Sequence, residues 1–299
     1  MPNPSVDRIE VLSTDLLDRH RPMVNALKET ARSLRLEFGW HYLLDQTWIL
    51  SHLDDPRDCL ILDAGAGTGV LQWHLAKQGA RVISVDRTSR ANLPLRFRTR
   101  FQVRGMRRSD LVSWDKVLKE SLLGSNNWRV KMSTQAQNVL GLAAMRPGRG
   151  QVIVYNQDLA DLRDIPDSSV DAVVSVSALE HNQPEALESV VAELMRVLKA
   201  GGVLLASLNA SPEQDWWHEA SSGWCYSEAT LRRIFQIAPE IPSNYDRYPE
   251  LFQALKNCSE LRQDLAGFYY HSGNNGMPWG KWDPQYVPVG ICKVKRQNM

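Results

Sequence analysis

The sequence predicts an α/β fold built on a doubly wound sheet, and three observations carry this prediction. The run 59–62 is short and apolar, as expected for a buried strand. A glycine-rich turn and then an apolar rhythm typical of a helix follow it, up to Ala76. Further apolar runs alternate with helical segments along the rest of the chain. A strand, a glycine turn and a helix in this order form the phosphate- or nucleoside-binding corner of such sheets.

The spacing of the glycines narrows the class of ligand. A dinucleotide-binding fold has G-x-G-x-x-G, but the position of the third glycine is occupied by Val70. Here Asp63 precedes Gly65, Gly67 and Gly69 at intervals of two residues. A carboxylate would repel a pyrophosphate, whereas it suits a ligand with cationic groups, such as an ammonium beside a sulfonium. The pattern resembles motif I of the class I S-adenosylmethionine (SAM)-dependent methyltransferases.

The remaining strands can be placed in chain order. Apolar runs predict strands at 81–86, 151–155, 168–177 and 203–207, and two more at 267–271 and 286–294. The resemblance implies that an antiparallel sixth and seventh strand finish the fold. The expected sheet therefore has seven strands in the order 3-2-1-4-5-7-6, with the last strand antiparallel.

Acidic residues after the second and third strands match further motifs. Asp86 closes its strand 17 residues after Gly69, where an acid accepts hydrogen bonds from ribose hydroxyls. Asp158 resembles the acid of motif II, which accepts a hydrogen bond from the adenine amino group. The resemblance implies that the backbone amide of Leu159 then reaches a ring nitrogen of the adenine. Alternatively, Asp158 caps the following turn. The resemblance implies SAM as the cofactor, held by Asp63, Gly65, Ala66, Gly67, Gly69, Asp86, Arg87, Asp158, Leu159 and Ser177.

The segment 178–181, Ala-Leu-Glu-His, follows the fourth strand. It resembles the small-molecule methyltransferases of ubiquinone and menaquinone biosynthesis (methyltransferase type 11), where a similar Glu-His faces the methyl group. Because SAM is an activated donor, alignment supplies most of the rate, and a base is needed only for a protonated acceptor. His181 is the candidate base, or else it buttresses the next helix. The candidate substrate residues are Trp40, His41, Glu180, Trp216, His218 and Tyr269.

Residues 7–54 read as helices, and the sequence predicts a helical N-terminal cap over 1–55. A SAM-binding methyltransferase domain would then span 56–299, with residues 88–150 inserted between the second and third strands. From Arg87 to Arg149 there are 11 Arg and 3 Lys against three acidic residues, a net charge of +11 in a chain of net charge +1. This segregation indicates an anionic partner for the segment; alternatively, the segment docks on the acidic remainder of the chain or stays solvated.

The run 96–104 within this insertion alternates basic residues with apolar ones, among them Phe97 and Phe101. Such a run can be an extended segment that clamps phosphates and stacks on bases. It can equally be a loop that packs both phenylalanines inward and leaves its arginines in water. The second interpretation is favoured, since no known RNA-binding module surrounds the run.

Composition and missing motifs exclude several classes of function. No apolar run approaches ~18 residues, so no membrane span is expected, and the N-terminus lacks the form of a signal peptide. The four cysteines are far apart and form no metal motif, which favours a reduced, cytoplasmic protein without a metal. There is no Asp/Asn-Pro-Pro-aromatic tetrapeptide for a flipped base. The leading hypothesis is methyl transfer to a small molecule. The alternatives are methylation of RNA or another polyanion bound by the insertion, and SAM binding without catalysis in a regulatory protein.

Overall fold

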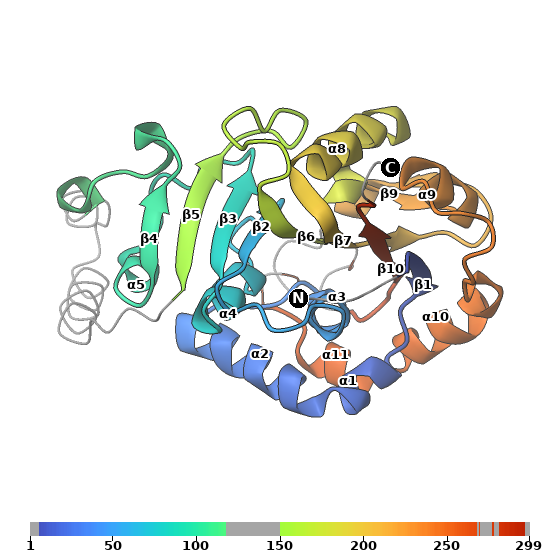
Figure 1. The fold of residues 1–299 in the computed structure, drawn as a ribbon. Helices are drawn as coiled ribbons and strands as arrows, with labels where there is room; N and C mark the ends of the chain where they lie inside the picture. The colour runs from blue at the N-terminus through green and yellow to red at the C-terminus, as the bar shows by residue number, and fades with distance from the viewer. Residues whose placement is uncertain (1–5, 118–149, 268, 270–276, 278–280, 297–299) are drawn as a thin grey trace.

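The computed structural model describes residues 6–117, 150–267, 269, 277 and 281–296. Its strands are β1 (Arg8–Val11), β2 (Leu60–Ala64), β3 (Arg81–Asp86), β4 (Gln102–Gly105), β5 (Gln151–Asn156), β6 (Val170–Val176), β7 (Leu198–Ala210), β8 (Trp216–His218), β9 (Gly223–Tyr226) and β10 (Val287–Val294). They form one mixed sheet at the centre of the molecule (Figure 1). Its main path runs β1-β10-β7-β6-β2-β3-β5-β4, and β9 and β8 branch from β7.

The predicted sheet is confirmed along its central strands. β5, β3, β2, β6, β7 and β10 correspond to the predicted order 3-2-1-4-5-7. The first five of these run parallel, and β10 is antiparallel to β7. Parallel strands covered on both faces read as continuous apolar runs, which is why the sequence revealed them. The carboxyl ends of β2, β3, β5 and β6 therefore share one edge of the sheet, where ligands bind in this class of fold.

Both outer edges of the sheet differ from the prediction. The predicted strand at 267–271 is wrong, because Gly267 lies in a turn and Tyr269 is helical; residues 268, 270 and 271 lie outside the described part of the chain. β1 lies beside β10 instead, although the sequence predicts helix for 7–54. Ile9 and Val11 are buried and alternate with polar residues, a period-2 pattern too short to stand out among helical neighbours. At the opposite edge, β4 adds a parallel strand next to β5.

Helices cover both faces of the sheet. The helices are α1 (Asp15–Arg19), α2 (Arg21–Leu34), α3 (Tyr42–Ser51), α4 (Leu71–Lys77), α5 (Leu95–Arg98), α8 (Pro184–Val197), α9 (Glu228–Ile234), α10 (Tyr248–Lys256) and α11 (Ser259–Gln263), with 3₁₀ turns η1 (Arg108–Asp110), η2 (Leu179–His181), η3 (Glu219–Ser221) and η4 (Tyr245–Arg247). Figure 1 shows α2 and α3 on the lower side of the sheet and α8 and α9 on the upper side. Among the described residues, no helix has the length and apolar character needed to cross a membrane.

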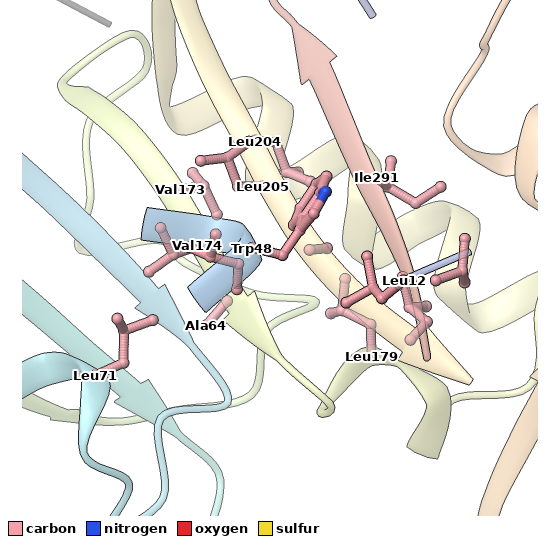
Figure 2. Close-up of a cluster of buried hydrophobic side chains, with 14 of the residues drawn as sticks. Leu12, Trp48, Ala64, Leu71, Val173, Val174, Leu179, Leu204, Leu205 and Ile291 are labelled. Carbon is pink, nitrogen blue, oxygen red and sulfur yellow. The ribbon is translucent and has the colours of Figure 1, made fainter. Parts of the chain in front are cut away.

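Trp48 on α3 joins the N-terminal helices to the sheet. Its ring is fully buried in the cluster that contains Leu204 and Ile291 (Figure 2). The indole Nε1 donates to Oε1 of Glu10, on β1, at 2.5 Å. A Cβ at Gly290 on β10 would lie 2.4 Å from the indole ring, so a glycine at this position lets α3 approach the sheet closely. The N-terminal helices are thus anchored on the same sheet that carries the glycine corner.

The run 96–104 is not one extended segment, since it contains the end of α5 and the start of β4. Phe97 and Phe101 are both buried, and the Phe97 ring stacks on Trp73 with 4.6 Å between the ring centroids. The inward packing of the two phenylalanines is therefore confirmed. Arg98 departs from the expected exposure of the arginines, because it is buried and donates to two backbone carbonyls.

Another part of the basic insertion docks on the acidic remainder of the chain. Arg107 Nε lies 2.9 Å from Asp164 Oδ2, and the guanidinium lies over the Tyr155 ring at 4.7 Å from its centroid. This contact matches one of the two interpretations of the charge segregation. Residues 118–149 of the insertion lie outside the described part of the chain.

Candidate functional site

A cavity of about 1200 Å³ lies at the carboxyl ends of β2, β3, β5 and β6. Its walls come from these strand ends, from the start of α3 and from the segment near β10. The sequence predicted the cofactor residues from separate motifs, and the fold brings them to this one cavity. All ten line it: Asp63, Gly65, Ala66, Gly67, Gly69, Asp86, Arg87, Asp158, Leu159 and Ser177.

The glycine corner between β2 and α4 has a backbone that glycine favours. Gly65 and Gly67 have φ angles of +73° and +47°, in the left-handed region. A Cβ at Gly65 would lie 2.3 Å from the Cβ of Ala178, just past β6. The absence of a side chain therefore lets the corner pack against the neighbouring strand end and leaves its backbone facing the cavity.

Asp86 ties the end of β3 to this corner. Its Oδ2 accepts from the Gly67 amide at 2.8 Å, and its Oδ1 accepts from the Thr88 amide at 2.7 Å. A carboxylate oxygen has two lone pairs, so each oxygen can accept one more hydrogen bond. Asp86 thus holds the corner in place, and at the cavity its carboxylate can still accept hydrogen bonds from a ligand.

Asp63 is a buried carboxylate beside the cavity, with 3 % of its surface exposed. No residue in the described part of the chain donates a hydrogen bond to its side chain. Burial raises the pKa of Asp63 to about 7; the nearby Arg90 opposes this rise and Asp86 adds to it. A buried acid in this state is stabilised by any cation that binds next to it.

Arg90 is a residue of the site that sequence reasoning missed. Its buried guanidinium joins the glycine corner to β3, because it donates to the carbonyl of Gly67 at 3.2 Å and to that of Ser84 at 2.5 Å. Its positive charge lies near the carboxylates of Asp63 and Asp86. In the sequence, Arg90 is one of many arginines in the basic insertion, and only the folded chain distinguishes it from the others.

Asp158 caps the turn after β5, as one of its two interpretations expects, and its contact with adenine stays a prediction. It lines the cavity just past β5, and its Oδ1 also accepts from the Ala160 amide at 2.9 Å, which caps the turn. Leu159 lines the same wall. The turn geometry therefore fixes the Asp158 carboxylate at the cavity.

Only part of the predicted substrate set reaches the cavity. Trp40, His41, Glu180 and Tyr269 line it, whereas Trp216 and His218 do not. Side chains alternate along a strand, so Trp216 and His218 share one face of β8, and Trp217 between them lines the cavity instead. The His218 ring packs edge-on against the ring of Tyr286, with 5.3 Å between the centroids.

His181 lines the cavity from η2 and is exposed. Its Nδ1 lies 2.8 Å from the carbonyl oxygen of Ser222. A carbonyl only accepts, so Nδ1 carries the proton in the neutral ring, and Nε2 is the basic nitrogen. His181 is thus held by its backbone partner in the tautomer that a base acting through Nε2 requires.

The end of β6 is strained next to this histidine. Ser177 has a φ of +45°, and its amide donates to the Ser207 carbonyl at 3.1 Å. A residue other than glycine in this region costs on the order of 1–3 kcal/mol. The Ser177 hydroxyl donates to Oε1 of Glu180, so the strained turn directs a hydroxyl toward a buried carboxylate.

Comparisons with known proteins agree with this architecture. Residues 119–206 match the family model described as a methyltransferase domain, which includes β5, β6, η2 and α8. No significant match to a curated protein was found.

Several solved structures are similar to the chain at low identity. One is Burkholderia thailandensis 1,6-didemethyltoxoflavin-N1-methyltransferase with bound 1,6-didemethyltoxoflavin and S-adenosylhomocysteine, with 14% identity over 95% of this chain and 87% of that chain and a TM-score of 0.43. A putative sarcosine dimethylglycine methyltransferase from Galdieria sulphuraria has 15% identity over 92% of this chain and 100% of that chain, with a TM-score of 0.45. Magnesium protoporphyrin IX methyltransferase from Synechocystis PCC 6803 with bound SAM has 15% identity over 74% of this chain and 71% of that chain, with a TM-score of 0.35.

The central strand order and the glycine corner are those that the sequence predicts, and the family model matches a segment that contains β5 and β6. The chain thus carries a segment that matches a methyltransferase domain, within a mixed α/β sheet whose central strands have the predicted order.

Proposed function

We propose that the protein transfers a methyl group from SAM to a small-molecule acceptor bound in the same cavity. The observation that carries this proposal is the convergence of Asp63, the glycine corner and Asp86 on one cavity of about 1200 Å³. A pocket for one drug-sized ligand measures roughly 300–1,000 Å³. The cavity therefore has room for an acceptor next to the cofactor.

The residues at the strand ends fit SAM by their chemistry. Asp63 is a buried carboxylate without a donor among the described residues, and the ammonium of SAM would supply one. Asp86 has acceptor capacity left for ribose hydroxyls after binding two amides. Asp158 and Leu159 would hold the adenine, and Gly65, Gly67 and Gly69 would let the ligand approach the backbone. Ala66, Arg87 and Ser177 complete this proposed set.

SAM supplies a methyl group on a positively charged sulfur, which is already reactive. The task of the protein is then to hold the acceptor atom in line with that methyl group and to exclude water. His181 would take a proton at Nε2 when the acceptor arrives protonated, a role that fits its Nδ1 bond to Ser222.

Residues 1–55 would act as a cap over the cofactor, in front of a SAM-binding domain at 56–299 with its insertion at 88–150. Trp40 and His41 at the start of α3 both line the cavity. His41 is buried, and its Nδ1 bonds Asp45 Oδ2 at 2.6 Å, which fixes the ring in the wall. These contacts support a role of the N-terminal segment in closing the site.

Calorimetry on the purified protein tests the cofactor half of this proposal. We expect heat of binding with SAM and with S-adenosylhomocysteine, and none with a nicotinamide dinucleotide. Asp63→Asn should weaken SAM binding, whereas Asp161→Asn, at a partly exposed carboxylate outside the cavity, should leave it unchanged. Tight binding of the dinucleotide without binding of SAM would refute the assignment.

A methyl-release assay on a pool of small metabolites tests the transfer half. Production of S-adenosylhomocysteine that depends on the pool supports catalysis on a small molecule. Cofactor binding without turnover on any pool would leave only a SAM-binding protein.

A further inference from the structure

Glu180 is a buried acid that the proposed cofactor site does not use. It lies on η2, directly after β6, borders the cavity and has 2 % of its surface exposed. Its Oε1 accepts from the Ser177 hydroxyl. Its Oε2 is buried and has no hydrogen-bond partner in the described part of the chain. A buried acceptor without a donor is costly, and a bound molecule that donates to it would remove that cost.

The packing around Glu180 holds the carboxylate in this position. A Cβ at Gly223 on β9 would lie 3.1 Å from the Glu180 Cγ, so β9 closes tightly over the stem of the side chain. The Ser177 hydroxyl donates to Oε1, so one oxygen of the carboxylate already has a partner. Only the second oxygen is left for a ligand.

The charge of Glu180 is poorly compensated inside the protein. Within the described ranges, no Lys or Arg forms an ion pair with it, and burial raises its pKa. The two side chains that oppose this rise electrostatically are those of His181, which is exposed, and His41, which is already bonded to Asp45. A buried carboxylate in such surroundings is stabilised most by a cationic donor.

The walls near Glu180 are aromatic. Trp40, Tyr42, Tyr269 and Tyr286 line the same cavity, and the rings of Trp40 and Tyr286 lie 5.1 Å apart between centroids. Aromatic faces attract ammonium groups and pack against hydrocarbon. The side-chain oxygen of Gln46, which also lines the cavity, is a second buried acceptor without a donor among the described residues. The cavity that Glu180 borders therefore offers acceptors and aromatic faces to a ligand.

We propose that Glu180 anchors the methyl acceptor and that this acceptor is a small organic amine, whose N–H or ammonium group donates to Oε2 of Glu180. This inference rests on the proposed function, in which the acceptor shares the cavity with SAM. A carboxylate or phosphate group at this position would face a like charge. A hydrocarbon would leave Oε2 without a donor, and a hydroxyl would bind it without neutralising its charge.

The test measures binding, so it does not depend on turnover. The full-length protein is saturated with S-adenosylhomocysteine and titrated with matched triplets that share one skeleton: benzylamine, benzyl alcohol and benzoate, and then 2-phenylethylamine, 2-phenylethanol and phenylacetate. We expect the amine of at least one triplet to bind more tightly than its alcohol and its acid. Glu180→Gln keeps the size and the acceptor for Ser177, and should weaken amine binding roughly 10- to 100-fold, the range for a charged hydrogen bond.

The control variant is Glu185→Gln, at an exposed glutamate five positions along the chain and outside the cavity. It should bind the amines as the wild type does. Equal affinity for S-adenosylhomocysteine and equal thermal unfolding of Glu180→Gln and the wild type show that the variant is folded.

Three outcomes would overturn the inference: no amine binds, the acid or alcohol binds better than the amine in both triplets, or Glu180→Gln binds the amine as well as the wild type does. Failure of the proposed function is distinct from these, because the wild type would then not bind S-adenosylhomocysteine in the first place.

Discussion

Replacing Asp63 with asparagine should stabilise the ligand-free protein while weakening its binding of SAM. The substitution keeps the shape of the side chain and removes its charge. In the folded protein burial raises the pKa of Asp63 from 3.8 to about 7, a value that already includes the opposing effect of Arg90. The carboxylate thus costs stability at neutral pH in the absence of a cationic ligand, and asparagine removes that cost.

The sign and the size follow from proton binding. Between pH 3.8 and about 7 the folded state binds more protons at Asp63 than the unfolded state, so the free energy of unfolding falls as the pH rises. Each pKa unit corresponds to about 1.4 kcal/mol, so the rise from 3.8 to about 7 lowers the free energy of unfolding by about 4 kcal/mol above pH 7. About 3 kcal/mol of it falls between pH 5 and pH 8.

Urea unfolding followed by tryptophan fluorescence at pH 5, 6, 7 and 8 measures this effect. The stability of Asp63→Asn minus that of the wild type should grow by about 3 kcal/mol over this range. Asp161→Asn is the control. Because Arg163 lowers the pKa of Asp161, the free energy of unfolding of this variant minus that of the wild type should stay constant from pH 5 to pH 8. A difference for Asp63→Asn that stays flat from pH 5 to pH 8 would refute the buried, uncompensated state of this carboxylate.

Three further variants test the rest of the site. Gly65→Ala places a Cβ 2.3 Å from that of Ala178 at a φ of +73°, so calorimetry should show loss of SAM binding; wild-type affinity would mean that the corner can shift. Asp86→Ala should weaken the binding of SAM by roughly 1–3 kcal/mol, and an unchanged Kd would show that Asp86 does not bind the ribose. His181→Ala should lower kcat far more than it changes KM, since the base acts on the bound acceptor; wild-type turnover would assign His181 to packing.

The central sheet and the cofactor corner were predictable because both are local signals. A buried parallel strand is a continuous apolar run, and the corner needs glycines at set positions after it. Parallel strands side by side then bring their carboxyl ends to one edge, so Asp63, Asp86 and Asp158 could be expected to meet there. All three line the cavity.

The edge strands and the substrate wall were not predictable in the same way. β1 has four residues, and its pairing with β10 joins positions nearly a whole chain apart. Trp217 rather than Trp216 lines the cavity because the register of β8 against β9 decides which face turns inward. Both strand pairings depend on a partner strand that the residues of the strand itself do not reveal.

The sequence by itself determined the positions of the central strands, the glycine corner and the acids Asp63, Asp86 and Asp158, since each depends on residues close together in the chain, whereas the order of the strands came from the resemblance. Only the tertiary structure decided which charges are buried without compensation. The fold surrounds the buried Arg90 with carboxylates, whereas it leaves one oxygen of the buried Glu180 without a partner among the described residues. The cost of burying a charge thus depends on every neighbour that the fold places around it.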